Sequence, residues 1–440
     1  MAGLTYDVIV VGGGPAGMMA AICAAQDGAR VLLLEKNDAL GKKLLLTGHG
    51  RCNITNTQAL EQLREKYFEQ GKFLNSAFRQ WTPQRVQDVF QLWGVPNHEE
   101  ENGRIFPDSQ KSKTVLDALV TELENQGVDI RCHAAVQTIY RDKQYWKVVT
   151  EEEIFFATAV VLACGGKAFP QTGSTGDGYI WATKMGHTVQ PLVPALAPIL
   201  IRREKDAQTN EDEVFPMTGV TLSDVALTLM VEDRKVAQSR GDLLFTHQGF
   251  SGPVAMRLSR ALPEPEKKVL YQTGKVKIIW NLLPNLRQEE LQEKLLQAMN
   301  AGPNRPIRKI VKEVCALPER VVDFVMGEEA RELPCHEVTK GMRQGIVRRL
   351  LQFECVVDEP ANWENAYVTR GGINLKEIDP KTMASKCQSG IFFAGEVMDV
   401  DGDSGGFNLQ HAWASGAIAG HSSSTLSKMP QTTIDAQNIR

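Results

Sequence analysis

The chain has 440 residues, of which 42% are hydrophobic and 23% charged, a balance typical of a globular protein too long for one compact core. Its apolar stretches are far shorter than the roughly 20 residues that cross a bilayer, and a net charge of −4 gives no general attraction to nucleic acid. Eight scattered cysteines without a CxxC pair favour reduced thiols in the cytoplasm and indicate neither a disulfide framework nor a metal site.

The first 36 residues carry the pattern of a dinucleotide-binding unit. Residues 6–11 are apolar and β-branched, as in a strand buried on both faces, and the glycine pattern GxGxxG follows at once. Its first glycine permits a tight turn, the second admits the pyrophosphate, and the third brings the next helix against the strand. Residues 31–34 are predicted as the second strand, and the acidic residue after them can accept hydrogen bonds from a ribose. The predicted cofactor contacts are Gly12, Gly14, Pro15, Ala16, Gly17, Glu35 and Lys36.

Residues 41–56, GKKLLLTGHGRCNITN, form a second conspicuous segment. An apolar run ends there in a dense group of glycines, hydrogen-bond donors and one thiol, which neither a plain surface loop nor a buried strand requires. Arg51 suits a polarised carbonyl or a phosphate because its guanidinium is planar and permanently charged, and a structural ion pair is the competing interpretation. Cys52 could donate a proton to a substrate carbon, or could serve as a small buried hydrophobe.

Residues 58–127 are predicted to be mostly helical, because apolar residues recur there at three- and four-residue spacing. Short strands follow over residues 128–163. The last of them, in AVVLACGG, ends in small residues, as a further strand of the same parallel sheet would. In QTGSTGDGY the chain is expected to bend sharply and to start a helix at Gly178.

Three prolines in PLVPALAPIL mark a boundary where the composition changes. Strand-like segments separated by turns follow this boundary and suggest a small barrel, and a helical stretch comes after them. The predicted domains are residues 1–190 with 358–440 as the cofactor-binding domain, residues 191–280 with 352–357 as an inserted β-barrel, and residues 281–351 as a helical subdomain.

Within the insert, GDLLFTHQGFSGP is predicted to place His247 at a strand-to-helix turn. His247 is the best candidate for a catalytic proton donor, because an unperturbed imidazole titrates near neutral pH. A histidine that satisfies loop carbonyls is the competing interpretation. Basic residues at 305–312 and 343–349 could touch a phosphate backbone, but the acidic residues around them favour a solvated helix face.

The C-terminal segment GIFFAGEVMDVDGDSGGFNLQHAWASGAIAG repeats the order of strand, glycine loop and helix. A helix beginning near Asn408 would stabilise the negative charge that an isoalloxazine ring gains on reduction, and Glu396 could hold a ribitol hydroxyl. Dinucleotide-binding parts at both ends of a chain imply one domain built from both, which favours FAD over NAD. The predicted fold class is therefore α/β, a Rossmann-like FAD-binding domain assembled from both chain ends with an inserted β-barrel and helical subdomain.

Six motifs in order along the chain resemble those of the YhiN/BaiN-like family of FAD-dependent flavoproteins, also described as NAD(P)/FAD-dependent or aminoacetone-oxidase-like oxidoreductases. They are GKKLLLTGHGRCNITN, GRIFPDSQK, QTGSTGDGY, GDLLFTHQGFSGP, VTRGGINLKEIDPKTMASK and AGEVMDVDGDSGGFNLQ. The family usually has Asn where His49 stands, and the resemblance implies non-covalent FAD rather than a covalent bond through His49. The further cofactor contacts that it implies are Lys43, Thr47, Gly48, Gly50, Arg51, Cys52, Asn53, Val136, Ala163, Gly165, Gly395, Glu396, Asp403, Gly405, Gly406, Phe407 and Asn408.

The resemblance implies an FAD-dependent oxidoreductase, and we expect a reductase that transfers hydride from flavin N5 to a carbon–carbon double bond. Its candidate substrates are uracil in ribosomal RNA, which would become dihydrouridine, and a conjugated alkene in a steroid-like molecule. No second GxGxxG pattern occurs, so we expect electrons from a transiently docked NAD(P)H or another external donor. Two alternatives stay open, an amine oxidase that uses oxygen and a flavoprotein with structural FAD and a partner-binding insert. We expect a cytoplasmic monomer or homodimer without membrane association.

Overall fold

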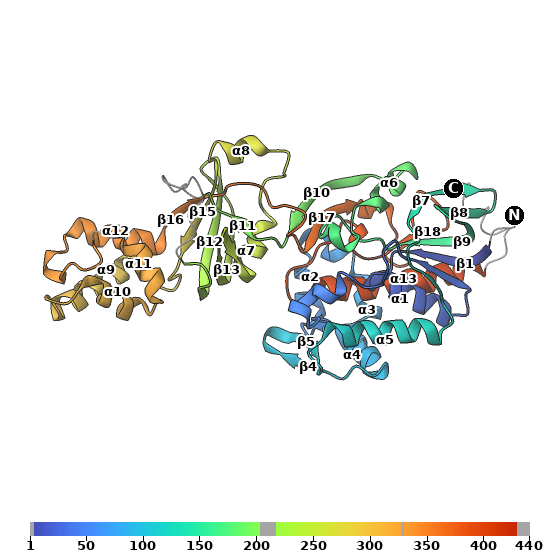
Figure 1. Cartoon of the computed structure of the whole chain (residues 1–440), viewed down its shortest axis with the longest axis horizontal. Helices are drawn as coiled ribbons and strands as arrows, with labels where there is room; N and C mark the ends of the chain where they lie inside the picture. Colours follow the sequence, from blue (N-terminus) through green and yellow to red (C-terminus); the bar gives the residue numbers. More distant parts are fainter. Residues whose placement is uncertain (1–3, 203–216, 328–329, 429–440) are drawn as a thin grey trace. The chain divides into compact units, whose positions relative to one another are not determined.

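The structure is a computed structural model of the chain, and it describes residues 4–202, 217–327 and 330–428 (Figure 1). The chain divides into two compact units. The first unit combines the residues up to 194 with those from 367 onward, and the second consists of residues 195–366. Both ends of the chain therefore belong to one unit.

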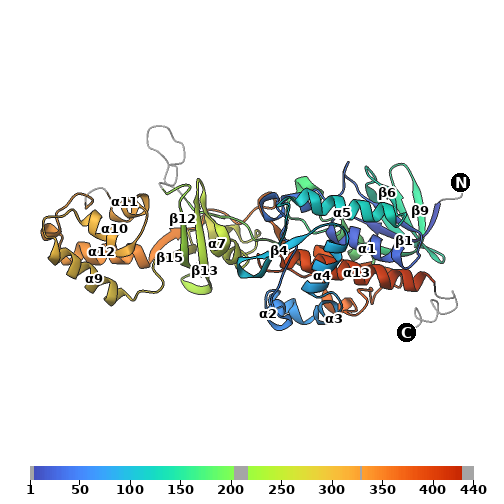
Figure 2. The same ribbon diagram turned by 90° about the horizontal axis from the view of Figure 1, so that it is seen from below.

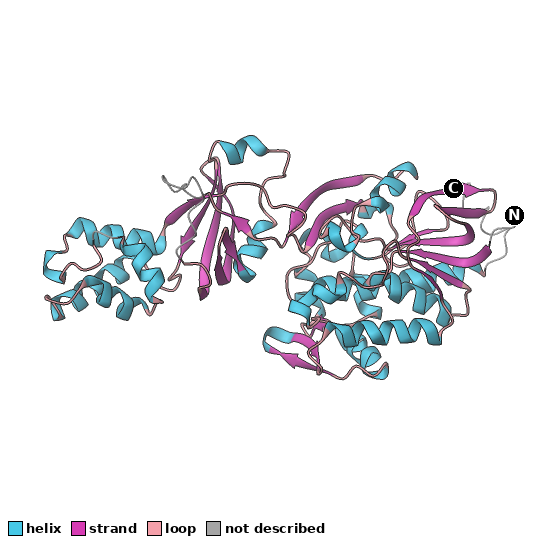
Figure 3. Cartoon of the chain, viewed as in Figure 1, coloured by secondary structure: helices cyan, strands magenta, loops and turns pink. Residues whose placement is uncertain are grey.

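A seven-stranded sheet forms the centre of the first unit (Figures 1 and 3). Its strands are β1 (Leu4–Val11), β2 (Val31–Leu34), β6 (Asp129–Arg131), β7 (Val136–Asp142), β8 (Tyr145–Thr150), β9 (Ile154–Leu162) and β18 (Ile391–Phe393). They are ordered β6-β2-β1-β9-β8-β7, with β18 beside β9, and the described pairs are parallel except β7–β8 and β8–β9, which are antiparallel. Val11 pairs with Leu34 and Leu162, so the parallel strands end at one edge, where ligands of such sheets bind.

Two helices from opposite ends of the chain, α1 (Pro15–Gln26) and α13 (Phe407–Ser427), lie side by side in both views (Figures 1 and 2). A Cβ added to Gly416 would lie 2.3 Å from the carbonyl oxygen of Ala16, and one added to Gly420 would lie 2.3 Å from that of Ala20. Because only glycine tolerates such a close approach of two backbones, the small residues of α13 determine how tightly the chain ends join.

Replacing Gly416 by Ala is expected to destabilise the first unit by about 1–3 kcal/mol, because the new methyl group would overlap the backbone of α1. Urea denaturation followed by tryptophan fluorescence measures this effect. Gly345 in α12 (Lys340–Leu351) is a matched control, because a Cβ added there meets nothing within 4 Å. Gly345→Ala should be neutral or stabilise slightly, and equal stability of both variants would contradict the close packing of α1 on α13.

Residues 58–127 are mostly helical, as expected, but a small antiparallel sheet that was not expected interrupts the helices. It has the order β3-β5-β4 and consists of β3 (Thr55–Asn56), β4 (Asn97–Glu100) and β5 (Arg104–Pro107). Asn102 and Gly103, with φ of +63° and +75°, make the turn between β4 and β5, and an Asn-Gly pair favours this kind of hairpin turn. The surrounding helices are α2 (Leu60–Glu65), α3 (Asn75–Gln80), α4 (Pro83–Leu92) and α5 (Ser112–Asn125).

The first unit is completed by α6 (Asp177–Lys184) and by a two-stranded sheet of β10 (Val189–Ala195) and β17 (Val368–Ile373). This sheet pairs a segment from the first half of the chain with one from the last quarter. Like the helix pair and the pairing of β18 with β9, it ties the C-terminal part of the chain to the N-terminal part.

The second unit contains a six-stranded antiparallel sheet in the order β11-β14-β13-β12-β15-β16 (Figure 3). A bridge between Ile201 and Val357 continues the pairing from its last strand to its first, so the sheet closes on itself. The buried Trp280 of this unit stacks on Phe353, with the two ring centroids 4.6 Å apart. The strands are β11 (Ile199–Leu200), β12 (Thr221–Val231), β13 (Arg234–Thr246), β14 (Gly249–Ser251), β15 (Val276–Asn281) and β16 (Phe353–Val356).

Helices in the second unit are α7 (Gly252–Ser259), α8 (Lys268–Gln272), α9 (Gln288–Ala301), α10 (Ile307–Cys315), α11 (Glu319–Met326) and α12. Phe324 of α11 packs edge-on against Trp280, which fixes this helix on the sheet. Among the described residues, no helix combines the length and the apolar character that a bilayer span needs. The predicted fold class is confirmed: the chain is α/β, with a Rossmann-type parallel sheet and further antiparallel sheets.

Candidate cofactor site and active site

The turn after β1 has the close contacts and the open space that a pyrophosphate needs. Gly12 has a φ of +108°, and a Cβ there would lie 2.5 Å from the carbonyl oxygen of Ala163 at the end of β9. A Cβ on Gly17 would lie 1.9 Å from the carbonyl oxygen of Gly12, so helix and strand touch. A Cβ on Gly14 meets nothing within 4 Å, because the space beside the start of α1 is empty of protein atoms. Backbone N–H groups at this helix start can therefore receive an anion.

Glu35 lies buried at the carboxyl end of β2 in a defined orientation. Its Oε2 accepts a hydrogen bond from the N–H of Gly13 at 2.8 Å, and its Oε1 accepts from both the N–H and the side-chain amide of Asn37. Oε2, which accepts one hydrogen bond, has a second lone pair available for a hydroxyl. The N–H of Ala134 donates to the carbonyl oxygen of Glu35, which brings the chain just before Val136 to the same strand end.

Two ion pairs join distant segments at this edge of the sheet. Lys36 contacts Asp177 at the start of α6 at 2.7 Å, and Lys43 contacts Glu396 at 2.8 Å. The other oxygen of Glu396 accepts a hydrogen bond from the N–H of Thr369 at 2.8 Å. The Lys43–Glu396 pair therefore connects the segment 41–56 with the C-terminal glycine loop, as an assembly from both chain ends requires.

Arg51 is held by two residues of the β3-β5-β4 sheet and by Gln110 in the loop that follows β5. Its guanidinium lies 4.0 Å from the ring centre of Phe106 and donates to Glu100 at 3.0 Å and to Gln110 at 2.9 Å. The guanidinium is thus both stacked and hydrogen-bonded, and it keeps free N–H groups because it carries five. The ion pair considered from the sequence is present, and it orients the planar group without using all of its donors.

Cys52 is completely buried and has a φ of +64°. Burial raises the pKa of its thiol to about 12, and a hydrogen bond with Thr47 offsets only part of that shift. The thiol is consequently a weak acid at neutral pH. The neighbouring His49 is exposed to solvent, and its backbone also has a positive φ, of +57°.

The start of α13 is surrounded by backbone and amide groups. A Cβ on Gly406 would lie 2.6 Å from the carbonyl oxygen of Thr55 and 2.8 Å from Oδ1 of Asn53. That buried Oδ1 has no hydrogen-bond partner among the described residues, and such an atom marks a place where a ligand can donate. Asn408 bonds instead to both the N–H and the carbonyl oxygen of Gly402, so it shapes the glycine loop.

Further side chains that position this site are not evident from the sequence motifs. Gln410 of α13 accepts from the hydroxyl of Thr55 and donates to the carbonyl oxygen of Trp81, both at 2.6 Å. The indole of Trp413 donates to the carbonyl oxygen of Ile54 at 3.0 Å. These bonds hold the segment 53–56 against α13, and the polar Gln410 inside a small-residue helix is the sequence signal for them.

The remaining predicted residues lie as follows. Ala163 follows β9 and is buried, and Gly165, with a φ of +73°, continues the same turn. Asp403 is buried in the glycine loop and accepts the N–H of Ser404 at 2.8 Å, while Gly405 and Phe407 flank Gly406, the residue before α13. His247 belongs to the second unit, where it is exposed in the turn between β13 and β14; this is a hairpin turn, and α7 begins only at Gly252.

Histidine 411 of α13 is a buried titratable group beside this site. Its ring is 2% exposed, neither ring nitrogen makes a well-formed hydrogen bond to a described residue, and burial lowers its pKa to about 4, with the backbone of Gly395 offsetting part of the shift. The unfolded chain, whose histidine has a pKa near 6.5, therefore binds more protons between pH 4 and 6.5 than the folded one.

We expect the stability contributed by neutral His411 to be complete above pH 6.5 and to fall by up to about 3 kcal/mol as the pH drops to 4. Urea denaturation across this pH range measures the loss. His411→Leu removes the titrating group and should flatten the pH dependence, whereas an unchanged pH dependence in that variant would show that other groups cause it.

Comparisons with known proteins agree with this geometry. The family model described as "HI0933-like protein Rossmann domain" matches residues 6–422. The "3-dehydro-bile acid delta(4,6)-reductase" of Clostridium scindens is 29% identical over 415 residues, covering 93% of this chain and 97% of its own. The "Ribosomal RNA dihydrouridine synthase" of Escherichia coli is 29% identical over 420 residues, covering 93% of this chain and 96% of its own.

Solved structures share the fold. The open conformation of a flavocytochrome c3 fumarate reductase has a TM-score of 0.50 at 16% identity, over 97% of this chain and 79% of that one. A 3-ketosteroid delta1-dehydrogenase of Sterolibacterium denitrificans has a TM-score of 0.51 at 14% identity, over 96% of this chain and 99% of that one. At these identities the likeness concerns the fold alone.

Proposed function

The chain belongs to the HI0933-like Rossmann-domain family and is an FAD-dependent oxidoreductase, and on that premise we propose that it reduces the double bond of an α,β-unsaturated carbonyl compound. The family expected from the six sequence motifs is thereby confirmed. The named substrates of two relatives share this chemistry. In a 3-dehydro bile acid a Δ(4,6) diene is conjugated with the 3-oxo group, and in uracil the C5–C6 double bond is conjugated with a carbonyl.

One observation carries the proposal: α1 begins at the edge where the parallel strands end, with open space at Gly14, and α13 begins beside the unpaired Oδ1 of Asn53. When bound and reduced, FAD supplies two electrons as a hydride. We propose that the start of α1 binds its pyrophosphate and that Glu35 binds its ribose. The start of α13 favours negative charge on the ring, and Lys43 and Glu396 orient the chain between these two points.

Arg51 is our proposed anchor for the substrate carbonyl. Its position on Phe106, fixed by Glu100 and Gln110, supports this role, because a preorganised guanidinium stabilises the enolate-like charge that develops as hydride adds to the conjugated double bond. The raised pKa of Cys52 speaks against this thiol as the proton source. His247 stays our proposed proton donor, and NAD(P)H our proposed electron donor.

The charges on the helices of the second unit favour a small substrate over an RNA backbone. Arg305 pairs with Glu313, Arg308 lies 3.3 Å from Glu319, and Lys312 lies 3.0 Å from the same carboxylate. Basic side chains neutralised in this way offer few free charges to phosphates. We therefore propose a conjugated ketone as the preferred substrate and ribosomal RNA as the second candidate.

The test follows the colour of the purified flavoprotein under argon. NAD(P)H should bleach it, and a steroid-like 4,6-dien-3-one should restore the oxidised spectrum with formation of a reduced ketone detectable by mass spectrometry. Ribosomal RNA from cells lacking the gene forms the second arm, with dihydrouridine as its product. Recolouring by neither acceptor, or hydrogen peroxide release with small amines in air, would overturn the proposed reduction.

A further inference from the structure

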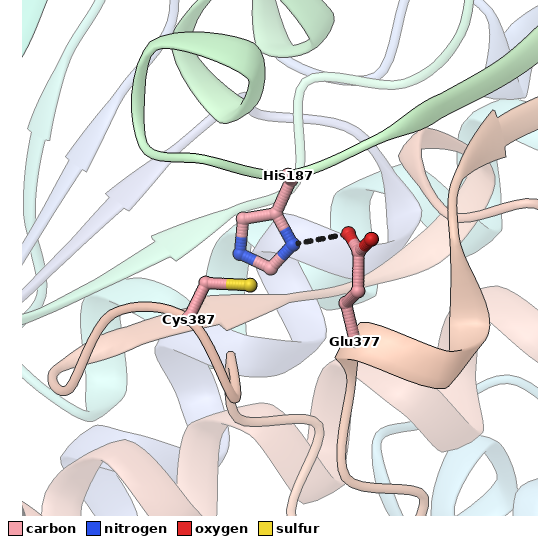
Figure 4. A group of neighbouring side chains, drawn as sticks. All are labelled: His187, Glu377 and Cys387. Carbon is pink, nitrogen blue, oxygen red and sulfur yellow. Dashed lines mark hydrogen bonds and ion pairs between the residues drawn. The ribbon is translucent and has the colours of Figure 1, made fainter.

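Three side chains with metal-binding atoms meet in the first unit, away from the glycine turns of the cofactor site. His187 follows α6, Glu377 ends the short turn Leu375–Glu377, and Cys387 lies in the loop before β18. A ring nitrogen, a carboxylate oxygen and the sulfur of these residues lie within 4.8 Å of one another (Figure 4). We propose that they form a binding site for one divalent zinc-type metal ion.

The backbone already holds two of the three ligands in register. An isolated bridge pairs Ile378 with Ser385, and the N–H of Lys386 donates to the carbonyl oxygen of Glu377 at 2.9 Å. Glu377 therefore lies one residue before Ile378, and Cys387 lies two residues after Ser385, on the two strands of this short antiparallel ladder. This arrangement brings both side chains to the same end of the ladder, where the imidazole lies between them (Figure 4).

The surrounding hydrogen bonds resemble those that orient metal ligands. Ser385 Oγ lies 2.7 Å from Nε2 of His187 and accepts the N–H of Cys387 at 3.0 Å, so one hydroxyl positions two ligands. Glu377 accepts the N–H of Thr188 at 2.9 Å with the oxygen that faces Nδ1. A histidine that binds metal through one nitrogen has the other fixed by a hydrogen bond, and Ser385 supplies it.

His187 is preorganised in a further way, because its side chain is completely buried and its ring packs edge-on against Phe393 with centroids 4.9 Å apart. Its Nδ1 lies 3.2 Å from Glu377 Oε2, which is close to the separation of about 3.4 Å between neighbouring ligand atoms in a tetrahedral zinc site. Binding through Nδ1 leaves the ring proton on Nε2, which faces Oγ of Ser385, and releases the thiol proton of Cys387 to solvent.

The ligand types select the ion. Thiolate and imidazole prefer zinc over magnesium or calcium, which favour sites made of oxygen atoms alone. Cys387 is the exposed cysteine among the free cysteines of the described residues, so an ion can enter from solvent and keep a water as its fourth ligand. The metal would tie His187, three residues after α6, to the hairpin before β18 and so fix the strand that leads to Gly395.

The experiment uses the FAD-loaded protein, stripped with EDTA and titrated with Zn²⁺ alone. We expect about one zinc ion per chain, and zinc should slow maleimide labelling of Cys387 by 10-fold or more, as mapped by peptide mass spectrometry. Labelling of the partly buried Cys132 is the internal control and should not change. Mg²⁺ should give no protection.

Glu377→Gln and Cys387→Ser replace the two proposed ligands whose side chains reach solvent. Each substitution should weaken zinc binding by 10-fold or more while the flavin spectrum stays unchanged. The proposal fails if Zn²⁺ does not protect Cys387, or if either variant binds zinc as well as the unaltered protein. Binding only at millimolar Zn²⁺ would likewise identify an adventitious ion and overturn it. Because flavin content is recorded separately, none of these outcomes depends on the proposed reductase activity.

Discussion

Gly14→Ala is expected to give a protein that folds normally but binds FAD about 100-fold more weakly. The backbone of Gly14 has φ −80° and ψ −178°, which alanine adopts without strain, and its Cβ would meet no protein atom within 4 Å. The methyl group would instead occupy the space that we assign to the pyrophosphate. Urea denaturation of the apoprotein and flavin fluorescence titration separate these two effects.

Gly17→Ala is the contrasting variant. Its Cβ would lie 1.9 Å from the carbonyl oxygen of Gly12, so it should lower the stability of the apoprotein as well as FAD affinity. If Gly14→Ala binds FAD normally, the cofactor does not approach the chain at this turn. If both variants lose stability equally, the open space beside Gly14 is not a ligand site.

Arg51→Met is expected to slow reduction of the enone acceptor by about 100- to 1000-fold, because the guanidinium that stabilises the developing negative charge is removed. FAD content and bleaching by NAD(P)H should stay close to those of the unaltered protein. Stopped-flow measurement of the two half-reactions distinguishes these steps, and Arg51→Lys should restore only part of the rate because an ammonium lacks the planar fork.

Two control variants test whether the loss of rate is specific to the guanidinium of Arg51. Arg104 lies 5.9 Å from the same Phe106 ring, so Arg104→Met removes a second cation from that ring without touching the Arg51–Glu100 pair. It should react at nearly the normal rate. Arg51→Met combined with Glu100→Gln tests whether an unpaired Glu100 is the cause, and an acceptor rate restored by the second substitution would remove Arg51 from the proposed mechanism.

The dinucleotide unit could be predicted from sequence because its signal is local. A buried strand, three glycines at fixed spacing and an acidic strand end lie within 36 residues, and the structure has β1, α1 and β2 in that order. The second glycine loop could be predicted for the same reason, because a strand precedes it and a helix rich in small residues follows it. The structure starts this helix, α13, at Phe407, one residue before the expected start.

Pairings between distant residues could not be predicted in this way. No motif around Arg51 indicates that it contacts Glu100 or Gln110. The hydrogen bond between Thr55 and Gln410 joins residues 355 positions apart, and no sequence pattern predicts it. The β4–β5 hairpin was missed for another reason, because helical spacing on both sides outweighed one Asn-Gly pair. His187 and Glu377, 190 positions apart, illustrate how a three-residue cluster escapes a search for ligand spacing.

The union of α1 with α13 has a consequence for how the protein is made on the ribosome. The strands β1 and β2 emerge early, but β18 begins at residue 391, about 360 residues after β2, which at typical synthesis rates is a delay of roughly 20–70 s. During this time the side of α1 that packs against α13 in the folded protein is uncovered in the growing chain, and chaperones are natural candidates to bind it. The yellow colour of the holoprotein should therefore arise only after α13 has been synthesised, and a chain truncated before α13 should remain colourless.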